Sequence, residues 1–406
     1  MSGSKWATAV RAISHKSSGV LWASRPRSSV AHFRIPQEYD RDRRITREEL
    51  LSLSNCVCMK TNSIRTRTQK TIAGAALAVT LSTPNVTQAA DQLAWDKTFP
   101  QSDKVIHQKV SFNNRLGINL VADLYLPKTL DRSKKHPAIV VGGPYGAVKE
   151  QSAGLYAQTM AERGFVTIAH DPSYNGESGG QPHFTASFEA LIEDFSAAVD
   201  FLGTKPFVDR ERIGVIGVCG SGSFGLAAAE TDPRIKAVAT VSMYDIGQAH
   251  RQGLGETVDT AALKKNLAEI SKQRWAEVDG APRIMAIGTP QKITEKSSDI
   301  DKEFYDYYRT PRGQHPRSST AFWRTSGAQM TLFWSFANLD WLSPRPVLFI
   351  TGDKAHSRIF SEHAFKKASE PKELHIVPNA GHVDLYDRVN VIPWEKLTSF
   401  FTEHLK

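Results

Sequence analysis

Hydrophobic positions change their spacing along the chain, and beyond about residue 100 strand-like and helix-like spacings alternate. Apolar runs at 138–141 and 212–218 predict buried parallel strands, which are apolar on both faces. Apolar residues at helical spacing over 151–163, followed by Gly164, predict a helix. The other predicted strands are 104–112, 118–126, 165–169, 235–242, 346–351 and 373–377, and the other predicted helices are 190–202, one ending at 230, 362–369 with Ser361 as its cap, and one starting at Pro393.

Repeated β-α-β units determine the expected fold class. Right-handed crossovers between parallel strands place helices on both faces of a single sheet. The first two strands, 104–112 and 118–126, alternate enough to form an opening antiparallel pair. The sequence therefore predicts an α/β fold with a mostly parallel, doubly wound sheet.

Residues 246–343 interrupt this alternation and are rich in aromatic side chains. We interpret them as a helical cap insertion over the carboxyl ends of the strands, where open α/β sheets bind ligands. Most of the aromatic residues are expected to form the core of the cap, and one or two to face substrate. They are Tyr305, Tyr307, Tyr308, Trp323, Phe333, Trp334, Phe336 and Trp341.

A predicted strand leads directly into a helix at the segment GVCGS, residues 217–221. Small residues two positions before and after Cys219 are what a nucleophile at a sharp strand-to-helix turn requires. The positive end of the helix is expected to lower the pKa of the thiol and favour the thiolate. A second register would put Ser221 at the turn, between Cys219 and Ser223. We favour Cys219 as the nucleophile because the apolar strand ends at Val218.

The predicted base is His382, which follows the last strand where a loop returns to the carboxyl ends of the sheet. An acid should orient it through the other ring nitrogen. The usual spacing points to position 355, which is an alanine, and Asp353 is the nearest carboxylate. Glu362 and Asp245 are the other candidates for this acid.

Two backbone N–H groups should bind the oxyanion that forms during acyl transfer. One belongs to Gly220, the residue after the predicted nucleophile. The other should come from the loop GGPYG at 142–146, where Pro144 has no N–H, so Tyr145 is the predicted donor.

Four segments, GGPYGAVKEQ, AHDPSYNGESGG, GVIGVCGSGSFGLAAAETD and NAGHVDLYD, give the chain a family resemblance over about residues 104–406. It resembles the dienelactone-hydrolase-like branch of the α/β hydrolases, and in particular bacterial members with a cysteine nucleophile and a helical insert. The resemblance implies an α/β-hydrolase fold and hydrolysis of an ester, lactone or thioester through an acyl-enzyme on Cys219. It implies His382 as base, Gly220 and Tyr145 as oxyanion donors, and no metal or organic cofactor.

Charge is distributed unevenly along the chain. Of the 51 basic and 42 acidic residues, residues 1–90 hold 14 and 5, so this segment carries the entire net charge of +9. The remaining residues, with 37 of each sign, are neutral and do not indicate a nucleic-acid-binding surface. No apolar run reaches the roughly 18 residues needed to span a membrane.

The segment 59–90 has the three parts of a secretory signal peptide: basic residues, a short apolar run and small residues at a cleavage site. We therefore predict an upstream extension at 1–58, a signal-peptide-like segment at 59–90 and a hydrolase domain at 91–406, with export to the periplasm or secretion. An organellar transit peptide at 1–34, or a cytoplasmic location, is the alternative. Removing the leader would leave Cys219 as a lone thiol.

The predicted function is hydrolysis of carboxylic ester, lactone or thioester bonds in a small-molecule acyl substrate. An acyltransferase or peptidase-like member of the same fold, or a ligand-binding protein without activity, is the alternative. The histidines lack zinc-ligand spacing such as HExxH, so no metal is predicted. The sequence does not determine the oligomeric state.

Overall fold

The computed structural model describes residues 95–286 and 288–406. The predicted extension at 1–58 and the signal-peptide-like segment at 59–90 lie outside the described residues. Within the described ranges, no helix is both long and apolar enough to cross a membrane.

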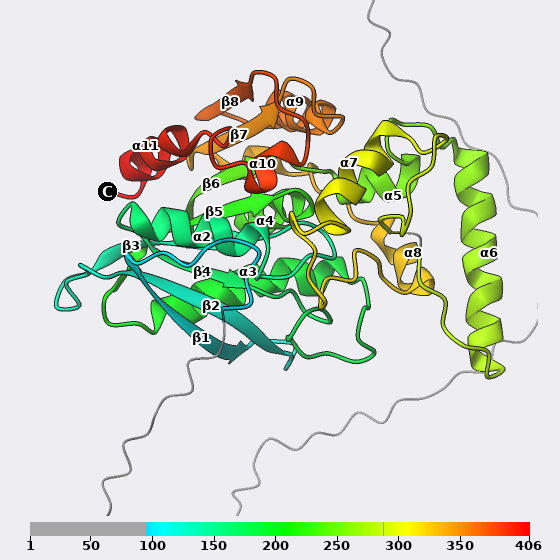
Figure 1. The fold of residues 1–406 in the computed structure, drawn as a ribbon, viewed down its shortest axis with the longest axis horizontal. Helices are drawn as coiled ribbons and strands as arrows, with labels where there is room; N and C mark the ends of the chain where they lie inside the picture. The colour runs from blue at the N-terminus through cyan, green and yellow to red at the C-terminus, as the bar shows by residue number, and fades with distance from the viewer. Residues whose placement is uncertain (1–94, 287) are drawn as a thin grey trace, which may run out of the picture. The chain divides into compact units, whose positions relative to one another are not determined.

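One eight-stranded sheet forms the centre of the domain (Figure 1). The strand order is β1-β2-β4-β3-β5-β6-β7-β8, with β1 antiparallel to β2, β2 antiparallel to β4, and parallel pairs from there to β8. This arrangement confirms the predicted α/β-hydrolase fold class. The strands are β1 (Val105–Asn113), β2 (Asn119–Pro127), β3 (His136–Gly142), β4 (Val166–His170), β5 (Val208–Val218), β6 (Ile235–Val241), β7 (Val347–Gly352) and β8 (Lys372–Val377).

Helices cover both faces of the sheet because consecutive strand residues point to opposite sides. On β5, the α-carbon of Gly214 faces Phe401 of α11, whereas Val215 packs against Gly225 of α4. Hydrophobic side chains from both layers pack against the central strands and form the main core, and Ile118, Leu120 and Ala197 form a second, small cluster. The helices outside the insertion are α2 (Ser152–Glu162), α3 (Phe188–Gly203), α4 (Gly220–Thr231), α9 (Arg358–Lys367), α10 (Asp384–Asp387) and α11 (Trp394–His404).

In its described residues, the segment between β6 and β7 carries two short 3-10 helices, η1 (Arg324–Ser326) and η2 (Leu339–Leu342), and four α-helices, which are grouped beyond the strand ends in Figure 1. These are α5 (Ile246–Gln252), α6 (Thr260–Val278), α7 (Asp299–Tyr308) and α8 (Gly327–Met330). Tyr307, Tyr308, Phe333 and Phe336 are buried, but Trp334 and Trp341 are exposed. The aromatic residues of this segment therefore form its core only in part. Helix α6 lies farthest from the sheet, and Ile270 is its one buried residue.

The prediction for α9 was wrong at its start. The helix begins at Arg358, four residues before the expected position, with Ser357 at its N-cap. Ser361 lies inside the helix, buried and without a hydrogen-bond partner for its hydroxyl, so it is not a cap. Phe360 packs into the core, and its burial stabilises an additional turn at the N-terminal end of the helix.

Candidate active site

Cys219 lies at the sharp turn between β5 and α4. Its backbone has φ 55° and ψ −120°, a conformation that costs energy in a non-glycine residue and is typical of functional turns. A β-carbon at Gly217 would come within 2.3 Å of the Ser221 carbonyl oxygen, so this position must be glycine. Ser221 itself lies in the first turn of α4, with its hydroxyl against Gly142. The structure therefore places Cys219, and not Ser221, at the apex of the turn.

A cavity of about 390 Å³ opens at Cys219. Its walls come from the loop after β3, from the segment after β6 and from α7, so it lies between the carboxyl ends of the strands and the insertion. Tyr308 is the member of the predicted aromatic set that lines it. The other large lining side chains are Tyr145, Tyr244, Ile246, Leu254, Ile300, Phe304 and Tyr386.

The two predicted oxyanion donors lie together at the sulfur. The backbone N–H groups of Gly220 and Tyr145 both donate to the Cys219 thiol. A β-carbon at Gly220 would come within 2.8 Å of the Tyr145 β-carbon, so only glycine permits this approach. The same two groups can bind a carbonyl oxygen attached to a carbon that reacts at the sulfur.

The expectation of a lowered thiol pKa was wrong. Burial raises the pKa of Cys219 to about 11, and the hydrogen bonds with Tyr386 and with the backbone N–H groups of Gly220 and Tyr145 oppose this rise only in part. Loss of hydration outweighs the field of the helix N-terminus, because the side chain is almost fully buried. The resting thiol therefore carries its proton at neutral pH and needs a base in order to react.

A pH profile of alkylation tests this conclusion. Because thiolate is the reactive form, the rate of iodoacetamide modification of Cys219 in a His382→Ala variant, which lacks the predicted base, should rise about tenfold per pH unit up to about pH 10, without a plateau near pH 8.5. Mass spectrometry of the Cys219 peptide separates it from Cys56 and Cys58. Glutathione in the same series provides the ordinary thiol profile. A plateau for Cys219 at or below that of glutathione would show that burial does not control the thiol.

His382 is fully buried and is connected to Cys219 through Tyr386. The Tyr386 hydroxyl lies 2.7 Å from Nε2 of His382 and is also hydrogen-bonded to the thiol. On the other side of the ring, Nδ1 lies 2.6 Å from Oγ of Ser357. A neutral ring with its proton on Nδ1 would donate to Ser357 and accept from Tyr386. Burial, together with His356, holds the pKa of His382 well below its ordinary value, so the ring is neutral at rest.

None of the three candidate acids contacts His382 in the described part of the chain. Asp353 is exposed, and its backbone N–H donates to Val377. Glu362 pairs with Arg358 at 2.8 Å. Asp245 caps α5, accepting from the Gln248 N–H at 2.8 Å. The structure thus does not bring the predicted acid, Asp353, to His382, since Ser357 occupies the position at Nδ1.

Sequence reasoning missed four further residues around His382, namely Ser357, Tyr386, His356 and Glu303. Tyr386 alone had a usable signal: it stands four residues after His382 in the segment NAGHVDLYD, on which the family resemblance rests. The other three come from two separate segments, His356 and Ser357 from the turn before α9 and Glu303 from α7, and have no motif.

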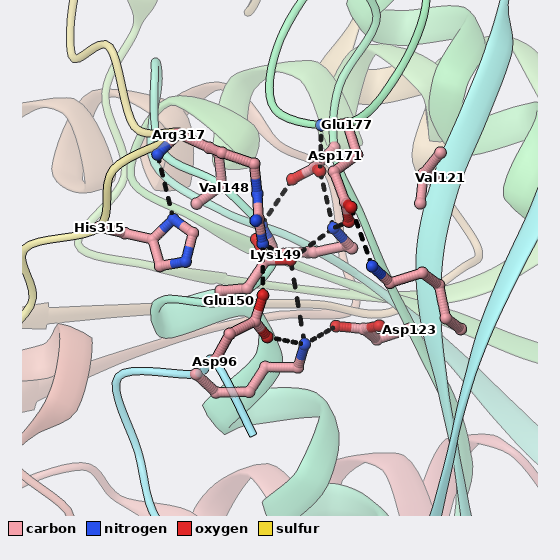
Figure 2. A network of polar contacts seen from close by, with 12 residues as sticks. Asp96, Val121, Asp123, Val148, Lys149, Glu150, Asp171, Glu177, His315 and Arg317 are labelled. Atoms are coloured by element: carbon pink, nitrogen blue, oxygen red, sulfur yellow. Dashed lines mark hydrogen bonds and ion pairs between the residues drawn. The ribbon is translucent and has the colours of Figure 1, made fainter. Parts of the chain in front are cut away.

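A buried ionic network anchors the loop that carries Tyr145 (Figure 2). The ammonium of Lys149 lies 2.9 Å from Asp171 and 2.5 Å from Glu150, and its backbone N–H donates to Asp171 at 2.7 Å. Burial alone would lower the pKa of Lys149, but Asp171 and Glu150 raise it, so it stays charged. Glu150, Asp171 and Glu177 are also the one group of described residues spaced to hold a metal ion. Lys149 supplies the positive charge there.

The Lys149 charge should matter far more for stability than an exposed lysine on the same network. Lys149→Met leaves the buried carboxylate of Asp171 without its cation and should lower the free energy of unfolding by about 3–5 kcal/mol. The matched control is Lys109→Met, which removes a partly exposed partner of Glu177 and should cost about 0–1 kcal/mol. Urea unfolding followed by tryptophan fluorescence measures both. Equal, small losses would mean that the network does not hold the loop.

Comparison with known proteins assigns a family. The model of the family described as X-Pro dipeptidyl-peptidase (S15 family) matches residues 117–387, which is more than half of the chain. The chain is 52% identical over 318 residues to the uncharacterized protein PA2218 of Pseudomonas aeruginosa, covering 77% of this chain and 84% of that one. The crystal structure of PA2218 superimposes with a TM-score of 0.75 at 50% identity, over 77% of this chain and 98% of the other.

Two further relatives extend the comparison. The uncharacterized protein YcjY of Escherichia coli is 35% identical over 286 residues, covering 70% of this chain and 94% of the relative. A thiohydrolase of Eupenicillium brefeldianum is 26% identical over 292 residues, covering 70% and 90%. The matched segment contains the cysteine turn, the loop with Tyr145 and the histidine loop. The chain therefore belongs to the X-Pro dipeptidyl-peptidase (S15) family and, with its eight-stranded sheet, to the α/β-hydrolase superfamily.

Proposed function

We propose that the protein is a cysteine-dependent hydrolase of ester or thioester bonds, with Cys219 as nucleophile. One observation carries the proposal: at the end of the cavity, the Cys219 thiol meets two backbone donors and the Tyr386 hydroxyl, which leads to His382. A nucleophile, a base and an oxyanion site then converge on one point.

In the acylation step, the proton of the Cys219 thiol passes to the Tyr386 oxygen while the Tyr386 proton passes to Nε2 of His382. The sulfur attacks the acyl carbon, and the oxyanion accepts hydrogen bonds from the N–H groups of Gly220 and Tyr145. When the carbon–oxygen or carbon–sulfur bond to the leaving group breaks, the leaving group takes the proton back from His382.

In the deacylation step, water enters where the leaving group was. It loses a proton to His382, and its oxygen attacks the thioester carbon on Cys219. The acid product leaves, and the proton returns to the sulfur. The resting thiol is protonated and the resting imidazole neutral, so every turnover begins and ends in the state that the structure describes.

The walls of the cavity favour an uncharged, apolar acyl group. Aromatic and aliphatic side chains dominate the lining, and burial lowers the pKa of His250 to about 4, so this lining residue is neutral. The relative described as a thiohydrolase and the resemblance to the dienelactone-hydrolase-like branch both support acyl chemistry on carbonyl carbons. The branch itself remains a prediction.

A dipeptidyl-peptidase activity is the second candidate, and Asp301 is the observation that favours it. This carboxylate is the one acidic side chain among the described residues of the cavity wall, where it could pair with a peptide ammonium. The family description points to the same reaction.

A substrate panel separates these functions. We would assay p-nitrophenyl hexanoate, hexanoyl-coenzyme A and alanyl-prolyl-p-nitroanilide, each with and without an added alcohol as acyl acceptor. The proposal predicts turnover of the first two, with hexanoic acid as the main product. Turnover of the anilide alone would favour the peptidase, and product that forms only with the alcohol would favour an acyltransferase.

A further inference from the structure

The residues around His382 leave one chemical problem open. During turnover this buried ring must carry a positive charge, yet its Nδ1 partner is the neutral hydroxyl of Ser357. An imidazolium without a nearby anion is costly in a buried site. In such sites a carboxylate usually stabilises the imidazolium. It was expected on the loop after β7, but there Asp353 is exposed to solvent.

The carboxylate nearest to the histidine loop comes from the insertion. Glu303, on α7, accepts the backbone N–H of Val383 at 2.9 Å through Oε1, and it also accepts the backbone N–H of His382. A β-carbon at Gly381 would come within 2.7 Å of the same Oε1. The glycine before His382 therefore makes room for this carboxylate.

Glu303 also reaches the ring of His382 through a second histidine. Its Oε2 lies 3.1 Å from Nδ1 of His356, and the His356 ring lies against that of His382, with centroids 4.7 Å apart at 37°. Nε2 of His356 is hydrogen-bonded to the hydroxyl of Tyr244, which lines the cavity. Next to Glu303 on α7, Phe304 packs its ring against both histidines.

Glu303 is ionised at neutral pH. Burial alone would raise its pKa, but the hydrogen bonds from His356 and from Val383 lower it below its ordinary value. One negative charge is thus fixed beside the loop that must hold a transient positive charge.

We propose that Glu303 is the positioning carboxylate for His382, supplied by α7 of the insertion instead of by the loop after β7. It holds the histidine loop through two backbone N–H groups, holds His356 against the ring, and opposes the charge that develops on His382. Ile300, Asp301 and Phe304 of the same helix line the cavity. Helix α7 therefore both forms part of the wall that would contact substrate and carries the carboxylate that positions His382. This inference rests on the proposed role of His382 as base.

The first test needs no substrate. Glu303→Gln keeps the shape and one acceptor but removes the charge. The rate at which iodoacetamide alkylates Cys219 at pH 7.5 should fall about tenfold in this variant, because the thiol proton must reach His382. Asp299→Asn removes an exposed charge from the same helix and should leave the rate unchanged. Urea unfolding of both variants checks that they fold equally well.

A double-mutant cycle shows whether Glu303 acts through His382. In a His382→Ala background, Glu303→Gln should cause no further loss, since the group that it supports is gone. Full additivity of the two losses, or an unchanged rate in Glu303→Gln, would overturn the proposal.

Turnover of p-nitrophenyl hexanoate distinguishes failure of this inference from failure of the proposed function. Glu303→Gln should lower kcat about tenfold to a hundredfold, with KM within about twofold, because misplacement of the base affects the chemical step. A change in KM alone would overturn the positioning role. If the parent shows no turnover but the double-mutant cycle of alkylation rates gives the expected result, the proposed hydrolase function is wrong and the role of Glu303 still holds.

Discussion

Cys219→Ala is expected to lower kcat/KM for activated esters by about a thousandfold or more, since the acyl-enzyme cannot form without the sulfur. The substitution removes one buried atom and leaves the turn otherwise unchanged, so the loss should not come from unfolding. The two oxyanion donors remain, and they alone sustain only a small residual rate.

Ser221→Ala is the matched control, because Ser221 is the other candidate nucleophile of the turn and lies only two residues from Cys219. Ser221 lies against Gly142 and is absent from the cavity wall, so its removal should change kcat/KM by less than about threefold. The reverse pattern, with Ser221→Ala inactive and Cys219→Ala active, would mean that the nucleophile belongs to the other register of the turn.

His382→Ala should have the second largest effect, a fall in kcat of about a thousandfold, within the range for loss of a general base. The reason is the raised pKa of Cys219, about 11, which leaves the thiol protonated at neutral pH. Raising the pH toward 10 should recover part of the lost rate, because hydroxide then removes the proton that His382 would have taken.

Two variants define the route of the proton. Tyr386→Phe keeps the ring but loses the hydroxyl between the thiol and Nε2, and should lower kcat about a hundredfold. His375→Ala, at a partly buried position on β8, should retain kcat within about twofold. Near-normal kcat in Tyr386→Phe together with a large loss in His382→Ala would indicate direct transfer between sulfur and imidazole.

The parts of this molecule that depend on local pattern could be predicted from sequence. The period of apolar residues predicted every strand of the sheet, and the glycines around Cys219 predicted the turn. The position of the Gly220 and Tyr145 backbone N–H groups at the Cys219 sulfur followed from the chemistry of the turn and from the missing N–H of Pro144. In each case the information lies within a few residues of the site.

The remaining features depend on burial and on contacts between distant segments. The shift in the thiol pKa comes from loss of water around Cys219, which no local pattern reports. Glu303 is 80 residues before Val383, and only the folded insertion brings them together. Asp353 was the natural expectation for the acid, but a short turn carries it to the surface and leaves Ser357 at the ring.

Trapping of the covalent intermediate tests the central claim most directly. The protein would be mixed with p-nitrophenyl hexanoate, quenched in acid within the first turnovers, digested and mapped by mass spectrometry. We predict a hexanoyl group on the peptide that contains Cys219, absent from the Cys219→Ala variant and removed by hydroxylamine. A hexanoyl group on Ser221, or steady turnover with no acylated residue in the quenched protein, would contradict the account.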